Sequence, residues 1–447
     1  MEKAVVIGGG IAGLLSAFVL SNFFRKVILI EKDSPPQGAK TRKGVPQGNH
    51  IHVLLNAGEN ILEDFFPGFR SDLINAGSKT AVLGEDVKWH LNGNWMPFFR
   101  GGMTTYFQSR PLLEHVLRAR INRIENIEIL YQKRFRNFLL GPDGKKFESV
   151  IFEDILSKKS ENLSGDFFVE ASGSGSDYPE QLRKNQFSVP NETIVEPDFA
   201  YSSGIFEIPP EWDKLWKAVL LYPKANEETR AGAVVPIEQN KWMITAAGYC
   251  GDYPPTDPIE FQEFLQSLQS KEVFEAVSNG KLVGEIRSFK FRHAVRRHFE
   301  NTAVMPENAI ALGDAICRMN PFFGQGIAVT ALEAKMLQTV LFAGSQHKQW
   351  PNARLPRKFY KEAAKILNVP WEMAIGEDFK YPQTHGKRPF LFPMTRWFKD
   401  RVMSANDPDV AKQFYQVMHF VDPPESLLNP KILKRVFFPS SRKGSSR

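Results

Sequence analysis

VVIGGGIAGLLSAFVLSN, at residues 5–22, is the stretch that decides the fold. A short apolar run ends at Ile7, and Gly8, Gly10 and Gly13 follow in the spacing G-x-G-x-x-G before an apolar helical segment. Gly8 permits a tight turn, Gly10 lets the backbone approach a pyrophosphate, and Gly13 lets the helix pack closely on the strand. The start of such a helix offers free N–H groups and a positive dipole end to phosphates. The stretch therefore predicts a dinucleotide-binding βαβ unit, and the alternative is a βαβ unit whose glycines serve packing alone.

A second apolar run, VILIEKD at residues 27–33, predicts the next strand of this unit. It ends at Glu31, eighteen residues past Gly13. A carboxylate at this place accepts hydrogen bonds from ribose hydroxyls and repels a 2′-phosphate. The loop is thus expected to bind FAD or NAD rather than NADP.

GDAICRMNPFFGQGIAVTALEA, at residues 313–334, lies about three hundred residues later. It follows a predicted strand at 309–312 and contains a carboxylate, a glycine turn and the start of a helix. Asp314 can accept hydrogen bonds from ribityl hydroxyls. The helix that begins near Ile327 can direct its N–H groups and positive dipole end at the N1–C2=O edge of a flavin, where negative charge develops on reduction. The two stretches together predict one FAD held at both ends, whereas the second alone could be a glycine-rich turn.

The residues of these segments give the predicted FAD site. Arg110 opens the amphipathic segment SRPLLEHVLRARI at 109–121, and it is expected near the pyrophosphate or the ribityl chain unless it is a surface arginine. The predicted FAD contacts are Gly8, Gly10, Ile11, Ala12, Gly13, Glu31, Lys32, Arg42, Arg110, Gly313, Asp314, Pro321, Gly324, Gln325, Gly326 and Ile327. The flavin-proximal catalytic candidates are Pro321, Phe323, Gly324 and Gln325, and no acid or base is assigned.

Alternating, aromatic-rich segments at 87–99, 103–109, 201–208, 231–237 and 241–249 predict an antiparallel sheet over the flavin. Its candidate substrate-pocket residues are Trp89, Trp95, Phe98, Phe99, Phe107, Phe206 and Met243, with core packing as the alternative for each. His50 and His52 would share one side of an extended segment. They lack nearby Cys or carboxylates, which makes a metal site a poor interpretation, so we expect no metal.

The whole chain is therefore expected to have an α/β fold with three parts. These are a Rossmann-like FAD-binding domain (GR2 type) from 1–86, 110–185 and 285–345, an antiparallel-sheet substrate lobe from 87–109 and 186–284, and a helical C-terminal region at 346–447 with a basic tail.

The composition limits the classes of partner and the cell compartment that can be expected. The net charge is +7, but the basic residues are scattered, and neither zinc-ligand spacing nor aromatic–basic interleaving suggests nucleic acid. Two cysteines fit a reducing compartment. No uninterrupted apolar run approaches a membrane span, and the glycines near the start speak against an export signal. We expect a cytoplasmic protein. The basic, aromatic tail from Pro430 is either a solvated terminus or a weak contact with an anionic membrane surface.

In these residues the chain resembles the FAD-dependent monooxygenases of the aromatic-hydroxylase (p-hydroxybenzoate hydroxylase-like) fold. GGGIAG, Glu31, Arg110, GDA and NPFFGQG carry the likeness, which spans nearly the whole chain. More narrowly, RKGVPQGNHIHVLL, FFPGF, SRPLLE, PWEMA and YPQTHGKRP look like the bacterial branch that includes polyether polyene epoxidases. The resemblance implies a C4a-hydroperoxyflavin that passes oxygen to an alkene or another electron-rich carbon of a lipophilic small molecule, in specialised metabolism.

The family's electron source would be NADH or NADPH, used directly or through a partner flavin reductase. Many members carry Asp-Gly where this chain has Ser172-Gly173, which puts direct reduction by NADPH in doubt. The W-x-W-x-I-P run of flavin halogenases is absent, which argues against halogenation. Two alternatives stay open: an FAD reductase of isoprenoid alkenes, similar to geranylgeranyl reductases, and a non-catalytic flavin-fold protein that binds lipid.

Overall fold

A five-stranded parallel sheet carries both glycine-rich stretches. Its strand order is β19-β11-β1-β2-β7, which places the strand before the first glycine loop at the centre. Ala4–Ile7 are buried because helices cover one face of the sheet and a small antiparallel sheet covers the other. The strands are β1 (Lys3–Ile7), β2 (Lys26–Ile30), β7 (Ile127–Leu130), β11 (Phe167–Glu170) and β19 (Ala309–Ala311).

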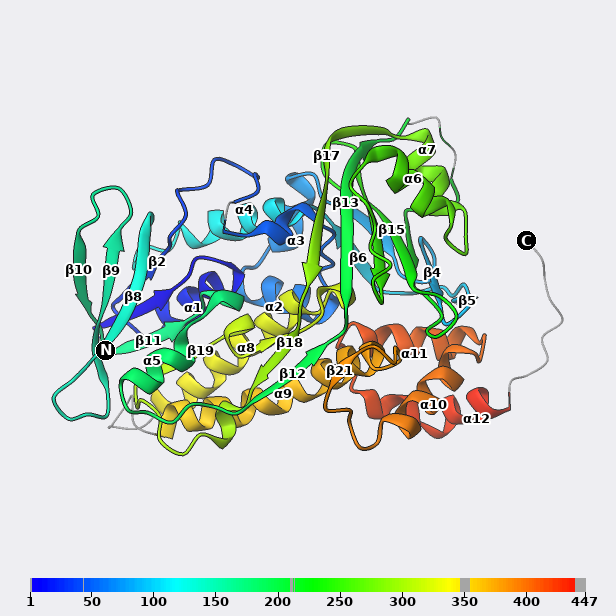
Figure 1. Ribbon diagram of the computed structural model, residues 1–447. Helices are drawn as coiled ribbons and strands as arrows, with labels where there is room; N and C mark the ends of the chain where they lie inside the picture. Colours follow the sequence, from blue (N-terminus) through cyan, green and yellow to red (C-terminus); the bar gives the residue numbers. More distant parts are fainter. Residues whose placement is uncertain (1, 43, 210–211, 213, 346–353, 439–447) are drawn as a thin grey trace.

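The computed structural model describes residues 2–42, 44–209, 212, 214–345 and 354–438. Figure 1 shows the parallel sheet at the end of the molecule that holds the N-terminus, with a second sheet at the other end. The helices around the first sheet are α1 (Ile11–Ser21), α2 (Asn56–Phe65), α3 (Phe69–Asn75), α4 (Arg110–Ile121), α5 (Tyr178–Lys184), α8 (Gly326–Ser345) and α9 (Arg354–Asp378).

Aromatic packing joins the small antiparallel sheet to the parallel one. Phe168 of β11 lies 5.9 Å from Phe138 and 6.4 Å from Phe147 between ring centroids. These rings belong to one large buried cluster that also includes the apolar residues of β1 and α1. The strands of this sheet are β8 (Lys133–Leu140), β9 (Phe147–Asp154) and β10 (Ser160–Ser164).

The second lobe is a seven-stranded sheet in the order β17-β13-β16-β15-β14-β4-β5. Its neighbours are antiparallel except for the parallel pair β14 and β4. The strands are β4 (Val87–Leu91), β5 (Asn94–Trp95), β13 (Phe199–Glu207), β14 (Ala218–Leu221), β15 (Arg230–Pro236), β16 (Lys241–Tyr249) and β17 (Lys281–Phe291). The helices α6 (Pro258–Gln266) and α7 (Glu272–Asn279) pack on one face through a separate apolar cluster.

The opposite face of the seven-stranded sheet is covered from the C-terminal end of the chain. Here α10 (Phe392–Met403), α11 (Pro408–Met418) and α12 (Pro430–Phe437) share an apolar cluster with β4. The Asp407 side chain caps α11 by accepting from the N–H groups of Asp409 and Val410. Smaller pieces complete the fold: β3 (Lys79–Val82) pairs with β6 (Thr104–Phe107), and a four-stranded sheet contains β12 (Glu192–Glu196), β18 (Ala294–Arg297), β20 (Cys317–Arg318) and β21 (His385–Gly386).

This architecture confirms the predicted fold class, but some details differ from the expectation. Strand β17 continues to Phe291 in the lobe sheet, past the predicted boundary at 284, because it pairs with β13 along its length. Strand β12 pairs with β18 rather than with the lobe sheet. The helix α9 packs on α8 and so belongs as much to the first lobe as to a separate helical region.

One described helix, α8, is long and apolar enough to cross a membrane by length and composition, although no such run was expected. More than half of that window is buried inside the structure, where α8 packs against α1, α2 and α9. These contacts are those of a core helix.

Candidate functional site

A cleft of about 660 Å³ runs along the carboxyl ends of the parallel strands. It extends from the first glycine loop to the turn at Asn320–Gly324 and the start of α8. Ligand clefts in doubly wound sheets lie at this edge, and the volume is in the range of cofactor sites. The predicted residues that line the cleft are Gly8, Gly10, Ile11, Ala12, Glu31, Lys32, Arg42, Arg110, Asp314, Pro321, Gly324, Gly326 and Ile327.

Steric contacts in the first glycine loop explain why glycine occupies Gly8 and Gly13. Gly8 has φ +98°, and a Cβ there would lie 2.5 Å from the carbonyl oxygen of Ala171. A Cβ on Gly13 would lie 1.7 Å from the carbonyl oxygen of Gly8, so helix and loop are in direct contact. Around Gly10 nothing lies within 4 Å of a Cβ. The loop thus packs tightly behind Gly10, while the backbone of Gly10 faces open space on the cleft side.

Glu31 closes the loop at the end of β2. Its Oε2 accepts from the N–H of Gly9 at 2.8 Å, and its Oε1 accepts from the N–H of Asp33 at 2.8 Å. Arg42 lies 3.3 Å from Glu31 and bridges to Glu114 at 2.8 Å. Each carboxylate oxygen can accept two hydrogen bonds, so Glu31 keeps acceptor capacity toward the cleft.

Glu114 also connects Arg42 to Arg110, whose Nε donates to Glu114 at 3.0 Å. Burial alone would raise the pKa of Glu114, but the two guanidinium groups lower it below its ordinary value. The pair of arginines is therefore held at the cleft by a charged carboxylate, and the cations line the cleft wall.

At the other end of the cleft, Asp314 follows β19. Burial raises the pKa of its carboxyl, and Arg110 and Arg318 act in the opposite direction. Behind it, Glu333 of α8 is fully buried and its Oε2 accepts from the N–H of Gly313 at 2.8 Å. Burial raises the pKa of Glu333 to about 8, so this carboxyl is largely protonated at neutral pH.

The turn at Pro321–Phe323 is fixed from behind by a buried polar cluster. Asn320 accepts from the N–H of Phe322 at 3.1 Å and donates to the Oδ1 of Asp378 at 2.8 Å. The hydroxyl of Tyr249 donates to the same Oδ1 at 3.2 Å. Burial raises the pKa of Asp378 to about 7. Gly324 then ends the turn with φ +66°, in the left-handed region.

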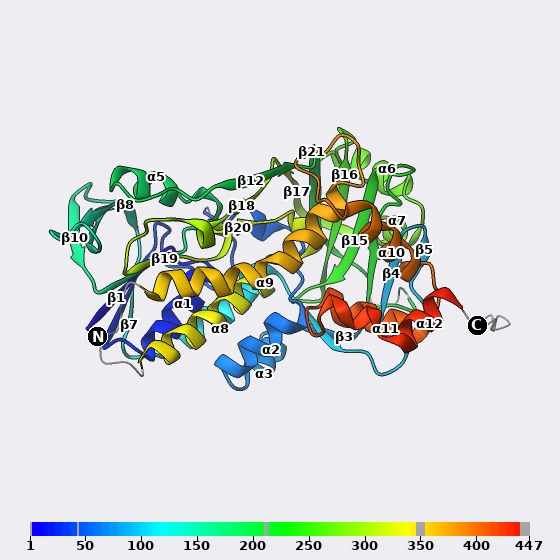
Figure 2. The same ribbon diagram turned by 90° about the horizontal axis from the view of Figure 1, so that it is seen from below.

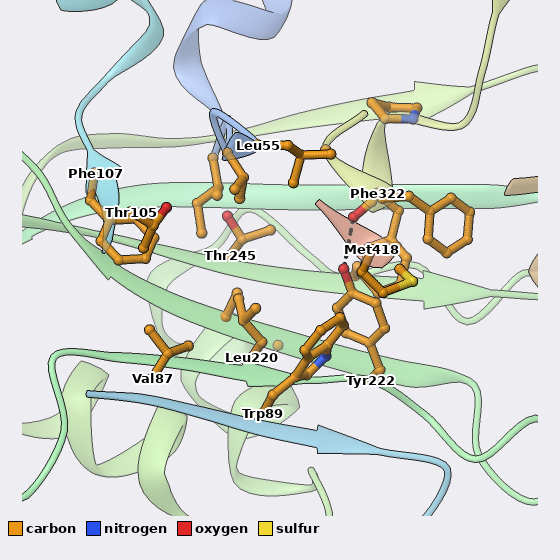
Figure 3. Close-up of a pocket in the computed structure, with 18 of the residues that line it drawn as sticks. Leu55, Val87, Trp89, Thr105, Phe107, Leu220, Tyr222, Thr245, Phe322 and Met418 are labelled. Atoms are coloured by element: carbon orange, nitrogen blue, oxygen red, sulfur yellow. Dashed lines mark hydrogen bonds between the residues drawn. The ribbon is translucent and has the colours of Figure 1, made fainter. Parts of the chain in front are cut away.

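A second, apolar cavity of about 100 Å³ lies on the far side of this turn, and Figure 3 shows its walls. Pro321 and Gly324 line both spaces. The labelled side chains Val87, Trp89, Leu220 and Thr245 come from the lobe sheet, while Met418 comes from the end of α11. The hydroxyl of Tyr222 donates to the carbonyl oxygen of Phe322 at 3.2 Å, and the two rings stack at 4.4 Å.

One chain of polar groups enters this apolar cavity. The Nδ1 of His50 lies 2.9 Å from the hydroxyl of Ser203, which lies 2.7 Å from the hydroxyl of Thr245. Burial lowers the pKa of His50 to about 4, so its ring is neutral at physiological pH. His52 instead lines the large cleft, so the two histidines face different spaces and the expectation that they share one side is wrong.

Comparisons with known proteins agree with this geometry. Residues 4–176 match the family model described as FAD dependent oxidoreductase. The matched segment holds the first glycine loop, Glu31, Arg42 and Arg110, so this part of the chain is similar to FAD-dependent oxidoreductases. The curated protein called Protein Rv3254, from Mycobacterium tuberculosis (strain ATCC 25618 / H37Rv), is 26% identical, and the match covers 94% of this chain and 90% of that protein.

Solved structures of flavin enzymes are similar to this chain in fold. The flavin-dependent brominase Bmp2 gives a TM-score of 0.67 at 15% identity over 94% of this chain and 93% of that chain. PqsL, a probable FAD-dependent monooxygenase from Pseudomonas aeruginosa, gives 0.62 at 16% identity over 85% and 97%. The p-nitrophenol 4-monooxygenase PnpA from Pseudomonas putida DLL-E4 gives 0.64 at 14% identity over 93% and 97%. At these identities the likeness concerns the fold.

The residues of the large cleft fit FAD. A Cβ on Gly10, Gly173 or Gly326 would project into open space, as a backbone approached by a ligand requires. Arg42 and Arg110 supply cations, and Glu31 and Asp314 supply acceptors at opposite ends of the cleft. Two predicted contacts, Gly13 and Gly313, lie behind the lining and support it by packing and by the bond to Glu333. Gln325 is 2% exposed and lies outside the lining of either cavity.

The turn that departs from the family pattern is held by a carboxylate of its own. Glu170, at the end of β11, accepts from the N–H of Ser172 at 3.0 Å and from the hydroxyls of Ser172 and Ser176. Burial raises the pKa of Glu170. Ser172 and Gly173 line the cleft without a charged side chain at that point.

Among the predicted pocket residues, Trp89 and Phe107 line the apolar cavity, and Phe323 does so from the flavin turn. The other five do not line it. Phe206 and Trp95 belong to the apolar cluster under α6 and α7. Successive side chains of a strand point to opposite faces of the sheet, and this alternation places Phe206 on the face opposite the cavity. Phe98 is 61% exposed. Phe99 and Met243 are buried in the cluster shared with the C-terminal helices and lie outside the cavity lining.

Sequence reasoning missed residues that reach the cavity from distant segments. They are His419, Tyr415 and Met418 at the end of α11, Tyr222 beyond β14, and Thr105 of β6. Their separate positions in the chain gave no local pattern. A signal was available in the amphipathic helix at 408–418, whose apolar face had to cover something. No cluster of three or more His, Cys, Asp or Glu side chains suited to a metal occurs in the described part of the chain.

Proposed function

We propose that this protein is an FAD-dependent monooxygenase that transfers oxygen to a lipophilic small molecule, by epoxidation of an alkene or by hydroxylation. The observation that carries the proposal is the position of the apolar cavity. It shares Pro321 and Gly324 with the cofactor cleft, so a substrate there would lie against the flavin turn. Bound FAD, once reduced, would supply the activation of molecular oxygen.

The cavity walls support this chemistry because they are mainly apolar and offer no charged group. Within the described residues, the lining has no Asp, Glu, Lys or Arg side chain, and its two histidines, His50 and His419, both have pKa values lowered to about 4 by burial. Oxygen transfer to an electron-rich carbon needs proximity and a dry site more than a side-chain nucleophile. The neutral chain His50–Ser203–Thr245 can orient one polar oxygen of the substrate by hydrogen bonding.

The electron source is part of the proposal. NADH or NADPH would reduce the FAD either directly or through a separate flavin reductase. The uncharged pair Ser172 and Gly173 favours the second route, because Glu170 is occupied by serine hydroxyls and the next carboxylate in the cleft lining is Asp177. Comparing anaerobic FAD reduction by NADPH alone with reduction in the presence of a flavin reductase distinguishes the routes.

The test is product analysis with isotopic oxygen. The holoenzyme is reduced without oxygen, mixed with ¹⁸O₂ and a panel of lipophilic alkenes and phenols, and the products are analysed by mass spectrometry. Incorporation of one ¹⁸O atom supports the monooxygenase. A product that gains two hydrogens and no oxygen would contradict the monooxygenase proposal and identify an alkene reductase. Tight binding of a panel member without turnover would identify a binding protein.

A further inference from the structure

The helices α10 and α12 carry exposed apolar side chains at the end of the molecule that holds the C-terminus. They lie side by side in both views (Figure 1, Figure 2), and the rings of Trp397 and Phe437 stack across them at 5.9 Å. Phe390, just before α10, is 95% exposed, and Phe438, just after α12, is 76% exposed. The exposed apolar residues of this surface, called the α10–α12 face below, are Phe390, Leu391, Met394, Trp397 and Phe438.

Positive charge borders the same face. Lys387, Arg401, Lys431 and Lys434 are exposed and have no carboxylate partner among the described residues. The guanidinium of Arg401 lies 5.9 Å from the ring centroid of Phe437. Asp400 is the single acid in the two helices, and it already pairs with Lys380 at 3.4 Å and Arg396 at 3.6 Å. The face is therefore apolar at its centre and cationic at its edge.

We propose that the α10–α12 face rests on an anionic lipid bilayer. Apolar and aromatic side chains at one helix face enter the boundary between headgroups and acyl chains, while nearby lysines and arginines attract anionic headgroups. A second copy of this chain is a poorer occupant. Self-association through the same face would bring Arg401, Lys431 and Lys434 of both copies together without an acid to balance them.

The face is also connected to the substrate cavity through a short path of packed residues. Val402 and Met403 of α10 and Val436 of α12 belong to the apolar cluster that contains Trp89. Both helices also pack against α11, whose Tyr415 and Met418 line the cavity. If the proposed function holds, the bilayer is where a lipophilic substrate would reach the enzyme, and this delivery step alone rests on that function.

The experiment is co-sedimentation of the holoenzyme with phosphatidylcholine vesicles, with and without phosphatidylglycerol. It needs no substrate, so its outcome is independent of the oxygen-transfer proposal. We expect binding that requires phosphatidylglycerol and weakens as salt rises. Lys431→Gln with Lys434→Gln should lower the vesicle affinity about 25-fold, at about fivefold for each cation. Phe390→Ser should lower it about tenfold.

Matched controls lie at the opposite end of the molecule, on the β8–β10 sheet (Figure 1). Lys145→Gln with Lys159→Gln removes the same charge, and Leu156→Ser removes an apolar side chain that is 73% exposed. Unchanged FAD content and melting temperature verify that each variant is folded. Equal losses in the test and control variants, or no sedimentation of the wild type, would overturn the proposal. Concentration-dependent dimers abolished by Phe390→Ser, without lipid binding, would assign the face to self-association instead.

Discussion

Gly10→Ala separates the folding role of the first glycine loop from its cofactor role. Gly10 has φ −75° and ψ −174°, which any L residue adopts, and nothing lies within 4 Å of an added Cβ. A methyl group there meets no protein atom. It projects toward the cleft where a phosphate of FAD would approach the backbone.

The expected magnitudes follow from this geometry. Loss of backbone freedom in the unfolded chain stabilises an alanine slightly, whereas alanine is a poorer helix N-cap than glycine, so the free energy of unfolding of the apoprotein should change by less than about 1 kcal/mol. The methyl group should displace at least one charge-assisted hydrogen bond to phosphate, worth about 1.5–3 kcal/mol. The FAD dissociation constant should therefore rise about 10- to 150-fold.

The assay is titration of apoprotein with FAD, followed by quenching of flavin fluorescence, next to urea unfolding of the apoprotein. Gly13→Ala is the contrasting variant, since its Cβ would lie 1.7 Å from the carbonyl oxygen of Gly8 and would displace helix from loop. We expect Gly13→Ala to destabilise the apoprotein itself. Wild-type FAD affinity in Gly10→Ala would refute the placement of the phosphates at this loop.

Three further perturbations test the site from other sides. Asp378→Asn should flatten the pH dependence of the free energy of unfolding. The native pKa of Asp378, about 7, exceeds the ordinary value of 3.8, so the wild type loses up to about 1.4 kcal/mol of stability per pH unit as the pH rises between those values. An unchanged slope of stability against pH in urea unfolding would contradict this. Tyr222→Phe removes the hydroxyl bonded to Phe322 and should lower the free energy of unfolding by about 1 kcal/mol; a change near zero would show that water replaces the bond. Ala233→Phe places a ring in the apolar cavity and should abolish product formation while FAD content stays at the wild-type level, whereas normal turnover would move the substrate site elsewhere.

The parts of the fold that depend on short-range sequence patterns were predictable. The turn at Gly8, the acid at Glu31 and the second stretch around Asp314 each require particular residue types at fixed spacing, and all of them line the same cleft. Patterns of this kind report local geometry. They place strand, turn and helix without information about the rest of the chain.

The walls of the apolar cavity were harder to predict because they depend on strand parity and long-range packing. Phe206 and Met243 lie on strands that were expected. Phe206 nevertheless faces α6 and α7, and Met243 packs in the cluster shared with the C-terminal helices, outside the cavity lining. A shift of one residue along a strand reverses the face, so aromatic content alone cannot assign a lining. The helix α11 reaches the cavity from a segment with no motif of its own.

The C-terminal segment thus supports walls of both the cofactor cleft and the apolar cavity. Asp378, the last residue of α9, holds Asn320 and through it the turn that lies between the cleft and the cavity. Fourteen residues later α10 begins, and after it comes α11, whose Tyr415 lines the cavity. Because the flavin turn and the cavity wall are held by one continuous segment, a displacement of that segment on a membrane would change cofactor environment and substrate access together.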